Sequence, residues 1–429
     1  MNTSSLHQIF LANPFVCTDS RDVTKGALFF ALKGELFDGN HFAGDAIRHG
    51  AAYAVVDNPE MVVSDRYILV ANVLSALQDL ATYHRKTFKI PVIGVTGSNG
   101  KTTTKELLTQ VLSKKFVVHS TKGNYNNHIG VPLTLLAMPA NTEIAVIEMG
   151  ANKLGDIRQL SDIALPSYGI ITNLGKAHLE GFGSFEGVIR AKTELYDAIK
   201  KCNGKLFVDA DNPILKQNSN NIERILYGTS SDAEFCGKIK SEFPYLTVNY
   251  SENGTLHSLN TNLTGAYNFQ NVMTTIAVGR HFGIAINDIC KANADYVPSN
   301  HRSQIIISDR NVIILDAYNA NPTSMQAALE NLQRYPAKSK CAIVGDMFEL
   351  GEYAKDEHHR ILELALSHRF DRVIAVGLTF GNFRNMFPFE FYDHVSELSA
   401  RLKDYPISDH VILLKGSRKM GLEALTSTL

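Results

Sequence analysis

One stretch limits what this chain can fold into more than any other. It is an apolar strand, Val92–Val95, that runs into a glycine loop and then into a helical pattern. The loop reads Thr96-Gly97-Ser98-Asn99-Gly100 and continues as Lys101-Thr102-Thr103. Loop glycines let backbone amides surround phosphate oxygens, the helix N-terminus adds a partial positive charge, and the lysine adds a full one. The stretch therefore predicts a nucleotide phosphate loop, with the Thr102 hydroxyl directed to a magnesium ion.

This loop is a variant of the Walker sequence. The strict pattern has glycine six residues before the lysine, where this chain has Val95. The strand–loop–helix order nevertheless favours phosphate binding over a glycine turn that only joins a strand to a helix. Nucleotide binding by itself leaves a kinase, a switch, a motor and a ligase open.

The length of 429 residues predicts about three domains, so we looked for borders between them. Ile90-Pro91 ends a helical pattern, because proline disfavours the α conformation in the residue before it. A second polar break lies at Val297-Pro298-Ser299-Asn300. The predicted domains are residues 1–89, 90–299 and 300–429.

Apolar strands alternate with amphipathic helices along most of the chain, which predicts the α/β class. We expect a small mixed α/β first domain, a central P-loop ATPase-like domain with a mainly parallel sheet covered by helices on both faces, and a C-terminal Rossmann-like domain. An antiparallel patch is expected between Ala233 and Leu263, and a hairpin at 304–316. The other predicted strands are 27–32, 52–56, 67–70, 92–95, 116–119, 143–148, 168–172, 205–209, 342–344, 372–376 and 411–414; the predicted helices are 41–49, 73–88, 102–112, 154–163, 185–199, 269–281, 324–334, 356–367 and 396–404.

Composition excludes several classes of function. Lys and Arg number 42 and Asp and Glu 43, so the net charge of −1 provides no field for a nucleic acid. No apolar run approaches the roughly 18 residues of a membrane span, and the start of the chain lacks the pattern of a signal peptide. The five cysteines form no CxxC pair. We expect a cytoplasmic protein that binds neither nucleic acid nor membrane.

Three further residues carry chemistry. Glu148 ends the apolar strand 143–148, at the edge where a parallel sheet presents ligands, and is a candidate magnesium ligand. His178 follows the next strand in a glycine-spaced loop. Spacing alone leaves Glu148 open as an exposed strand-end acid, His178 as a surface histidine, and Lys192 as a solvated lysine.

Six ordered segments together resemble the Mur ligase family, the ATP-dependent amide-forming enzymes of bacterial cell-wall synthesis. The glycine loop is similar to that family's T-G-x-N-G-K-T/S sequence, which accounts for Val95. Two segments, 316–325 and 345–351, resemble the member that adds D-alanyl-D-alanine. The remaining segments are 19–39, 123–132 and 414–418.

The resemblance implies an ATP-dependent ligase of peptidoglycan precursor synthesis. ATP phosphorylates the terminal carboxylate of UDP-N-acetylmuramoyl-tripeptide, and the amine of D-Ala-D-Ala attacks the acyl phosphate to give the pentapeptide, ADP and phosphate. The implied partners are these small molecules, and we expect a monomer. The implied cofactors are ATP and two Mg²⁺ ions, with Lys192 carbamylated so that it becomes an anionic ligand.

The resemblance also assigns residues. The catalytic set is Lys101, Glu148, His178 and Lys192, and the metal ligands are Thr102, Glu148, His178 and Lys192. ATP binding falls to Thr96, Gly97, Ser98, Asn99, Gly100, Lys101, Thr102, Thr103, Asn268, Arg302 and Asp316. The UDP substrate is assigned to Ser20, Arg21, Lys33, Asn126 and Asn127, and D-Ala-D-Ala to Asn319 and Asn321, with Lys415 and Arg418 near the same cleft.

Two positions depart from the family pattern: Tyr267 stands where histidine precedes the adenine-loop asparagine, and Lys153 stands where we expect histidine. The alternatives are another amino-acid-adding Mur ligase or a folylpolyglutamate synthetase-like ligase. The Asp19–Arg21 and Lys33-Gly34 pattern argues against the folate enzyme, which lacks a UDP-binding domain. An ATP-driven switch without a covalent product is the alternative from another class.

Overall fold

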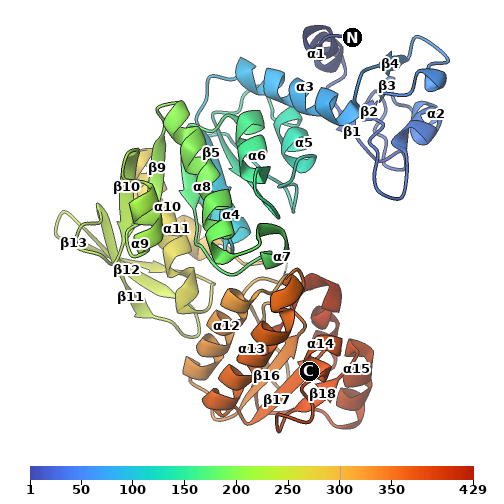
Figure 1. The fold of residues 1–429 in the computed structure, drawn as a ribbon. Helices are drawn as coiled ribbons and strands as arrows, with labels where there is room; N and C mark the ends of the chain where they lie inside the picture. Colours follow the sequence, from blue (N-terminus) through green and yellow to red (C-terminus); the bar gives the residue numbers. More distant parts are fainter. Residues whose placement is uncertain (300) are drawn as a thin grey trace.

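The computed structural model describes residues 1–299 and 301–429, and their strands form three sheets. The three sheets lie in three bodies that follow one another along the chain (Figure 1). Helix α3 (Val73–Thr87) joins the N-terminal body to the central one, and the C-terminal body lies at the other end of the central body. The α/β fold class is confirmed. The predicted limits at 89/90 and 299/300 fall between sheets and stay predictions; Asn300, where the third predicted domain begins, lies outside the described residues.

The N-terminal sheet is parallel, in the order β1-β2-β3-β4. The sequence missed its first helix, α1, which begins where the Asn2 side chain accepts a hydrogen bond from the Ser5 amide. The helix buries Leu6 and Phe10 in the core that includes residues of α3. The elements are α1 (Thr3–Ala12), β1 (Val16–Cys17), β2 (Leu28–Phe30), α2 (Ala43–Arg48), β3 (Tyr53–Val56) and β4 (Tyr67–Leu69).

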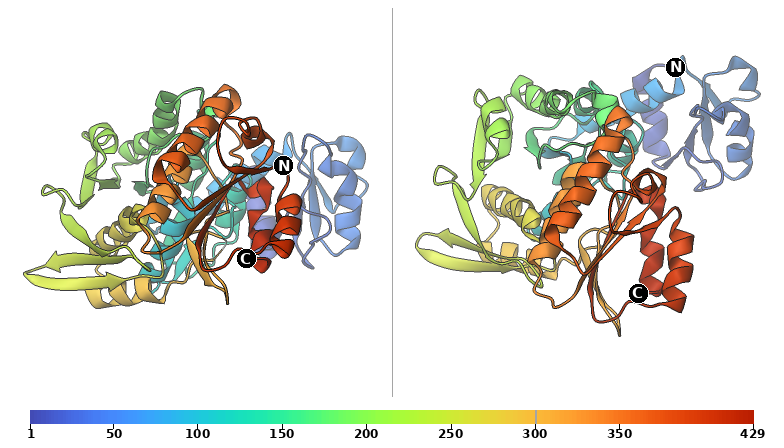
Figure 2. Two further views of the ribbon diagram at one scale, coloured as in Figure 1. Left: turned by 90° about the horizontal axis from the view of Figure 1, so that it is seen from below. Right: turned by 60° about the horizontal axis from the view of Figure 1, so that its bottom comes forward.

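The central sheet has the order β13-β12-β11-β10-β9-β8-β5-β7-β6 and is parallel from β6 to β11. Its strands are β5 (Val92–Thr96), β6 (Val118–Ser120), β7 (Ile144–Glu148), β8 (Tyr168–Ile171), β9 (Lys205–Asp209), β10 (Glu223–Gly228), β11 (Phe235–Ser241), β12 (Thr247–Glu252) and β13 (Thr255–Asn260). The predicted antiparallel patch is confirmed, because β11, β12 and β13 pair antiparallel. They extend away from the rest of the central body (Figure 2).

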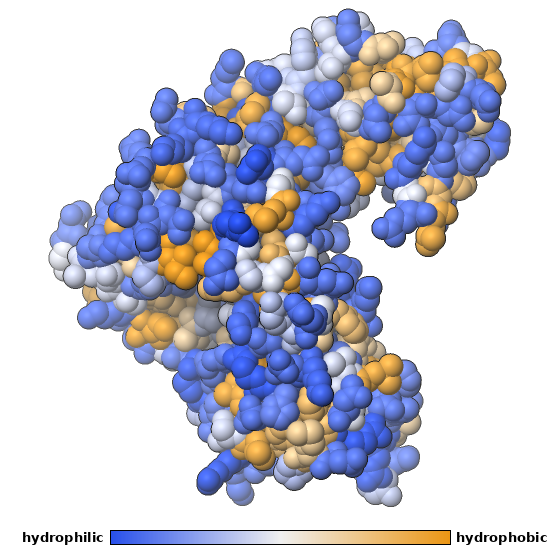
Figure 3. All heavy atoms as spheres, in the orientation of Figure 1, coloured by the Kyte–Doolittle hydropathy of each residue, from blue (hydrophilic) through white to orange (hydrophobic). Residues whose placement is uncertain are grey.

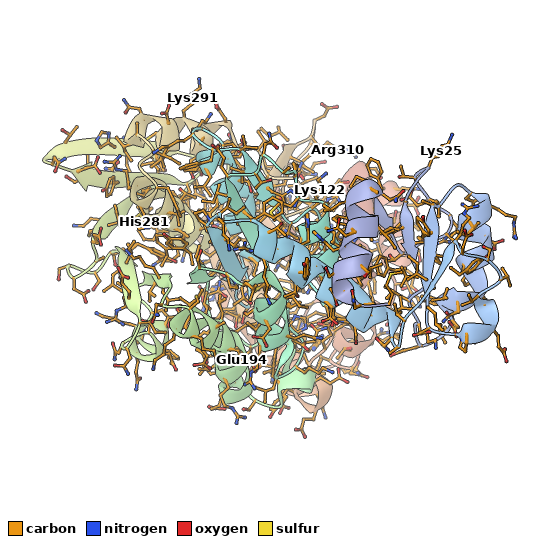
Figure 4. The ribbon with its side chains drawn as sticks, turned by 90° about the horizontal axis from the view of Figure 1, so that it is seen from above. Lys25, Lys122, Glu194, His281, Lys291 and Arg310 are labelled. Atoms are coloured by element: carbon orange, nitrogen blue, oxygen red, sulfur yellow. The ribbon has the colours of Figure 1, made fainter. Side chains whose placement is uncertain are left out.

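Helices cover both faces of this sheet, as predicted. Their bounds are α4 (Lys101–Leu112), α5 (Gly130–Leu136), α6 (Asp156–Ala164), α7 (Leu179–Phe182), α8 (Phe185–Lys201), α9 (Pro213–Asn218), α10 (Phe269–His281) and α11 (Ile286–Asp295). Apolar side chains of α6 and α8 belong to one core, and those of α4, α10 and α11 to another. Figure 4 shows Glu194 on α8 and Lys291 on α11 on opposite sides of the sheet.

The C-terminal sheet has the order β14-β15-β19-β16-β17-β18. The predicted hairpin is confirmed as the antiparallel pair β14–β15, and the other pairs are parallel. The elements are β14 (Gln304–Ile307), β15 (Val312–Leu315), α12 (Pro322–Arg334), β16 (Lys340–Gly345), α13 (Ala354–His368), β17 (Arg372–Val376), α14 (Leu378–Gly381), β18 (Glu390–Tyr392), α15 (Val395–Asp404) and β19 (Val411–Lys415). Short 3-10 turns lie at 39–42, 59–61, 266–268, 351–353, 418–420 and 422–427.

Strand register brings the candidate residues to one edge of the central sheet. Val95 of β5 pairs with Glu148 of β7, and Thr96 pairs with Ile171 of β8. The carboxyl ends of these parallel strands therefore share the edge where open α/β sheets bind ligands. The surface is largely hydrophilic and is hollowed between the N-terminal and C-terminal bodies (Figure 3). Among the helices of the described chain, none combines the length and apolarity needed to cross a bilayer.

Candidate active site

A cavity of about 690 Å³ lies at this edge, between the central and C-terminal bodies. Both bodies contribute polar side chains to its wall. Most of the predicted site residues line it: Ser98, Asn99, Gly100, Lys101, Thr102, Thr103, Asn126, Asn127, Glu148, His178, Asn268, Arg302, Asp316, Asn319 and Asn321. The structure thus brings the proposed ATP, metal and acceptor residues to one place.

The glycine loop needs both of its glycines. Gly97 has a φ of +147°, and a Cβ there would clash with the Thr172 hydroxyl. Gly100 has a φ of +76°, and its Cβ would lie 2.8 Å from the Asn271 side-chain oxygen. The Thr172 hydroxyl in turn donates to the Asn99 carbonyl at 2.5 Å. Only glycine lets the loop pass this close to its neighbours in that backbone conformation.

The Lys101 side chain bonds back to the glycine loop that precedes it. Its Nζ donates to the carbonyls of Gly97 at 2.7 Å and Ser98 at 3.2 Å. Burial lowers the pKa of Lys101 to about 8, and the nearby Glu148 carboxylate opposes that shift. The ammonium group therefore lies where loop-bound phosphate oxygens would need a cation.

Glu148 is 1% exposed, and its two oxygens differ in their contacts. Oε1 accepts hydrogen bonds from the Thr102 hydroxyl at 3.2 Å and from Asn126 Nδ2 at 2.7 Å. Oε2 is buried without a hydrogen-bond partner among the described residues. A buried carboxylate oxygen without a partner is costly, so a cation beside the Thr102 hydroxyl would complete it.

His178 has a strained backbone, with a φ of 52° at the start of α7. Its buried Nδ1 lies 2.5 Å from Glu349 Oε2 of the C-terminal body. Contact with His178 lowers the pKa of Glu349. Non-glycine residues with positive φ are uncommon and cluster at functional sites, so the position of this side chain is held by its surroundings.

Lys192 is a buried lysine on α8, with 1% of its surface exposed. Its Nζ lies 5.3 Å from the centre of the Phe182 ring, and within residues 1–299 and 301–429 we find no hydrogen bond or ion pair to it. Burial, followed by the charge of Lys101, holds the pKa of Lys192 well below its usual range. The side chain does not line the cavity wall. The solvated-lysine interpretation is therefore wrong.

The donor set fits magnesium in part. The Thr102 hydroxyl and the Glu148 carboxylate are hard oxygen donors of the kind that Mg²⁺ prefers. In the part of the chain that the structure describes, no three His, Cys, Asp or Glu side chains form a ready metal cluster. A second ion at His178 would need a further oxygen donor, and an unmodified Lys192 has no oxygen to offer.

The predicted adenine loop lies on the same wall. Asn268 is buried, donates to the Thr264 carbonyl at 2.8 Å and accepts from Asn271 at 2.9 Å. The Tyr267 hydroxyl lies 3.0 Å from the Ser303 hydroxyl of the C-terminal body, and burial raises its pKa. Tyr267 therefore joins two bodies. Lys153, the other departure, is exposed, and its amide donates to Asp156 at 3.1 Å.

The C-terminal body supplies two charged groups to the cavity. The Arg302 guanidinium stacks 3.6 Å from the centre of the Tyr318 ring, and its Nε is buried without a hydrogen-bond partner in the described chain. Asp316 pairs with Lys415 at 2.8 Å. Lys415 Nζ also donates to the Asn319 carbonyl at 2.9 Å. Among the described residues, Arg302 Nε thus has no acceptor, and the Arg302 side chain lines the cavity.

Several predicted binding residues already have structural contacts. Asn321 caps α12, and the Asn127 side chain accepts from the Gly130 amide at the start of α5. The Thr96 hydroxyl donates to the Met149 carbonyl, and neither Thr96 nor Gly97 lines the cavity. These groups shape the wall and the loop beneath it.

Three of the predicted UDP-substrate residues lie elsewhere, in the N-terminal body. Arg21 pairs with Asp19 at 2.6 Å, and Lys33 pairs with Asp57 at 3.0 Å. Neither they nor Ser20 line the cavity. The structure therefore separates them from Asn126 and Asn127, which do.

Among the residues of this wall that sequence reasoning missed are Asn173, Asn271, Asp209 and Glu349. Asn173 Oδ1 accepts from the Asn99 amide at 2.9 Å, and the Asn271 side chain accepts from Thr104 at 3.0 Å. Asp209 lines the cavity at the end of β9, and burial raises its pKa to about 7. Glu349 lines it from the C-terminal body. Asn173 follows a predicted strand and Asp209 ends one, a signal that could have found them. Glu349 lies in the segment 345–351 that resembles the family, but that resemblance assigned it no role.

Comparison with known proteins places the whole chain in one family. The Mur ligase family, catalytic domain model matches residues 14–95, the Mur ligase middle domain model 95–279, and the Mur ligase, glutamate ligase domain model 301–418. These matches follow one another in the order of the three sheets.

Relatives with nearly complete coverage narrow the assignment. The chain is 38% identical, over 96% of its length and 92% of the relative's, to UDP-N-acetylmuramoyl-tripeptide--D-alanyl-D-alanine ligase of Bacillus subtilis. Crystal structures of MurF from Acinetobacter baumannii (TM-score 0.88, 28% identity, 98% of this chain and 97% of that one) and of MurF from Thermotoga maritima in complex with ADP (TM-score 0.87, 29% identity, 97% of each) share its fold. The chain belongs to the Mur ligase family, and within it to the UDP-N-acetylmuramoyl-tripeptide--D-alanyl-D-alanine ligases.

Proposed function

We propose that this protein joins D-Ala-D-Ala to UDP-N-acetylmuramoyl-tripeptide at the expense of ATP. The observation that carries the proposal is the one cavity in which the phosphate loop, Glu148, His178 and the C-terminal residues 316–321 meet. A nucleotide, an acidic peptide end and an amine acceptor need such a shared site, because the acyl phosphate formed from the first two must reach the third before water does.

The first step transfers the γ-phosphoryl group of ATP to the terminal carboxylate of the tripeptide. A P–O bond to ADP breaks while a P–O bond to the carboxylate oxygen forms. Lys101 and the loop amides would meet the charge that develops on the phosphoryl oxygens, and Arg302 would meet it from the other side of the cavity. Asn268 and Tyr267 would hold the adenine end.

The second step is attack by the D-Ala-D-Ala amine on the acyl carbon. A C–N bond forms, the C–O bond to phosphate breaks, and the amine loses a proton. Asn319 and Asn321 are our candidates for holding the dipeptide, because both line the cavity on the C-terminal side. Closure of the C-terminal body over this site would exclude water from the acyl phosphate.

Two magnesium ions are part of the proposal. Thr102 and Glu148 would hold the first, and His178 and carbamylated Lys192 the second. When bound, the ions would neutralise phosphate charge. The burial of Lys192 supports the modification, because only a neutral amine reacts with carbon dioxide and burial lowers the pKa of this amine, which favours its neutral form.

The three bodies would divide the work. The N-terminal one would bind the UDP end through Ser20, Arg21 and Lys33, the central one would bind ATP, and the C-terminal one would bring the acceptor. Asn126 and Asn127 would meet the peptide part of the UDP substrate at the cavity. The domain limits at 89/90 and 299/300, the cytoplasmic location and the monomeric state stay predictions.

Purified protein, ATP, magnesium and UDP-N-acetylmuramoyl-tripeptide test the function directly. We expect phosphate release and a product of pentapeptide mass with D-Ala-D-Ala, and neither with D-Glu or a diamino acid. Phosphate release with a single amino acid, and none with D-Ala-D-Ala, would point to a sibling Mur ligase. Activity only with a folate and glutamate would point to the folylpolyglutamate synthetase alternative.

A further inference from the structure

The loop that carries His178 is held by the C-terminal body. Lys176 Nζ pairs with Glu357 at 2.6 Å, and the Lys176 amide donates to the Thr323 hydroxyl at 3.0 Å. Two residues further on, His178 meets Glu349. This one loop of the central body is therefore fixed by residues that lie 147 to 181 positions away in the sequence.

The Lys176–Glu357 ion pair is the first point of attachment, and we call it the latch. Glu357 on α13 is buried, and its second oxygen accepts from Arg360 Nε at 2.8 Å. Arg360 in turn donates to the Gln326 side chain on α12 at 3.0 Å. Glu357 is thus held within the C-terminal body by Arg360, which itself bonds to α12. Loss of Lys176 would leave the buried Glu357 carboxylate with Arg360 as its ion-pair partner, which opposes opening of the latch.

The second point of attachment is the contact between His178 and Glu349, which bears on the orientation of the His178 ring. Within the described part of the central body, the ring contacts the edge of Phe182, with centroids 6.3 Å apart, and its Nδ1 finds no hydrogen-bond partner. The polar group facing Nδ1 is Glu349, which belongs to the C-terminal body and whose carbonyl accepts from the Glu180 amide at 3.3 Å. The direction in which His178 Nε2 points therefore depends on the Glu349 carboxylate, which belongs to the C-terminal body.

We infer that Glu349 is a positioning residue, which orients His178 only when the latch has docked the C-terminal body. This rests on the proposed function, in which His178 holds a metal ion. Histidines that bind metals commonly give their other ring nitrogen to a carboxylate, and loss of such a partner costs about 10- to 100-fold in affinity or activity. His178 is therefore correctly oriented only when the C-terminal body, which would bind the acceptor, is docked on the central body.

Glu349→Gln tests the inference, with Glu352→Gln as the matched control. Glu352 is an exposed carboxylate that follows closely in the same segment of the chain. We expect Glu349→Gln to lower kcat about 10- to 100-fold with the KM for ATP changed by less than about twofold. The control should match the unmodified enzyme. A kcat within about twofold of that enzyme would overturn the inference, whereas failure of the unmodified enzyme to form the pentapeptide would instead contradict the proposed function.

A second measurement does not depend on turnover. We expect Glu349→Gln to weaken Mn²⁺ binding in the presence of ADP by about tenfold, while its radius of gyration in small-angle scattering stays that of the unmodified protein. Glu357→Gln should increase the radius of gyration, because it loosens the latch itself. If Glu349→Gln expands the protein as Glu357→Gln does, or leaves Mn²⁺ binding unchanged, Glu349 has a structural role only and the inference is wrong.

Discussion

Asn99 of the phosphate loop and Asn321 of the C-terminal body bond to each other across the domain border. Asn321 Nδ2 donates to Asn99 Oδ1 at 2.8 Å, although 222 residues separate the two. The family resemblance implies that Asn99 binds ATP and that Asn321 binds D-Ala-D-Ala. The two side chains are hydrogen-bonded to each other. A ligand that binds to either of them must therefore break this hydrogen bond or share its donor and acceptor.

Removal of this hydrogen bond should loosen the contact between the central and C-terminal bodies. Asn99→Ala deletes the side chain but leaves the loop amide, which bonds Asn173, in place. A hydrogen bond of this kind contributes about 1 kcal/mol, so we expect a measurable increase in the radius of gyration of the ligand-free protein. Asn382→Ala, at an exposed position of the C-terminal body, is the control. An unchanged scattering curve for Asn99→Ala would contradict the role.

Lys101→Ala should abolish turnover rather than only weaken binding. The Lys101 ammonium group stabilises negative charge that increases on the phosphoryl oxygens during transfer. Its loss should therefore raise the activation barrier of phosphoryl transfer more than it weakens binding of ATP. We expect kcat to fall by at least about a hundredfold, measured as phosphate release. Lys114→Ala, at an exposed lysine after α4, should retain full activity. Unchanged kcat in Lys101→Ala would refute the assignment.

Lys192→Ala should lose activity that a small carboxylate partly restores. The anion would stand in for the carbamate oxygens, because truncation of the side chain leaves space for it beside the proposed metal site. Activity with and without added acetate or formate is the measurement. Lys200→Ala, an exposed lysine on the same helix, is the control and should need no rescue. Full activity of unsupplemented Lys192→Ala would refute its ligand role.

Arg85, near the end of α3, bonds to the segment that follows this helix and to the end of α6. Its guanidinium donates to the carbonyls of Ala164 at 3.0 Å, Phe88 at 2.8 Å and Ile90 at 3.3 Å. Arg85→Ala would leave these carbonyls without their donor in a largely buried place, so we expect the free energy of unfolding to fall by about 2–4 kcal/mol. Urea unfolding measures it. Lys86→Ala, exposed beside it, should change stability by less than about 0.5 kcal/mol.

A pair of buried histidines makes the α1–α3 contact sensitive to acid. His7 Nε2 lies 3.2 Å from His84 Nδ1, and burial lowers the pKa of His84 to about 4 and that of His7 below its usual value. The unfolded chain, with ordinary histidine pKa values near 6.5, binds more protons over this range. The contribution to stability is therefore complete above about pH 6.5 and is lost as the pH falls toward 4.

Urea unfolding across that pH range tests the pair. His84→Phe keeps an aromatic ring between Phe10 and Phe88 but cannot titrate, so the loss of stability between pH 6.5 and 4 should become smaller. His41→Gln, at an exposed histidine of the same body, should leave the pH dependence as it was. The same slope in His84→Phe would show that other groups govern the acid response.

Local patterns were sufficient for most of the elements. The strand and helix on either side of the glycine loop, the hairpin β14–β15 and the antiparallel β11–β13 were all predicted, because each has its own periodicity or turn residues. Helices α1 and α5 were missed, since they are short and their apolar residues pack on α3 and α6 rather than forming a long stripe. Strand β10 was also missed, because only Ile225, Leu226 and Tyr227 form its apolar run and its place is fixed by its pairing with β9.

What the sequence determined by itself was the set of chemical groups at the ends of consecutive strands, Lys101 to His178, because the glycine spacing and strand order are local properties. It could not determine the state of Lys192, which depends on burial beside Phe182, or the role of Glu349, which reaches His178 only when two bodies meet. Burial and contacts between distant segments are properties of the tertiary structure. The sequence therefore determined which groups are present, and packing within and between the bodies decided which of them are buried, oriented and paired.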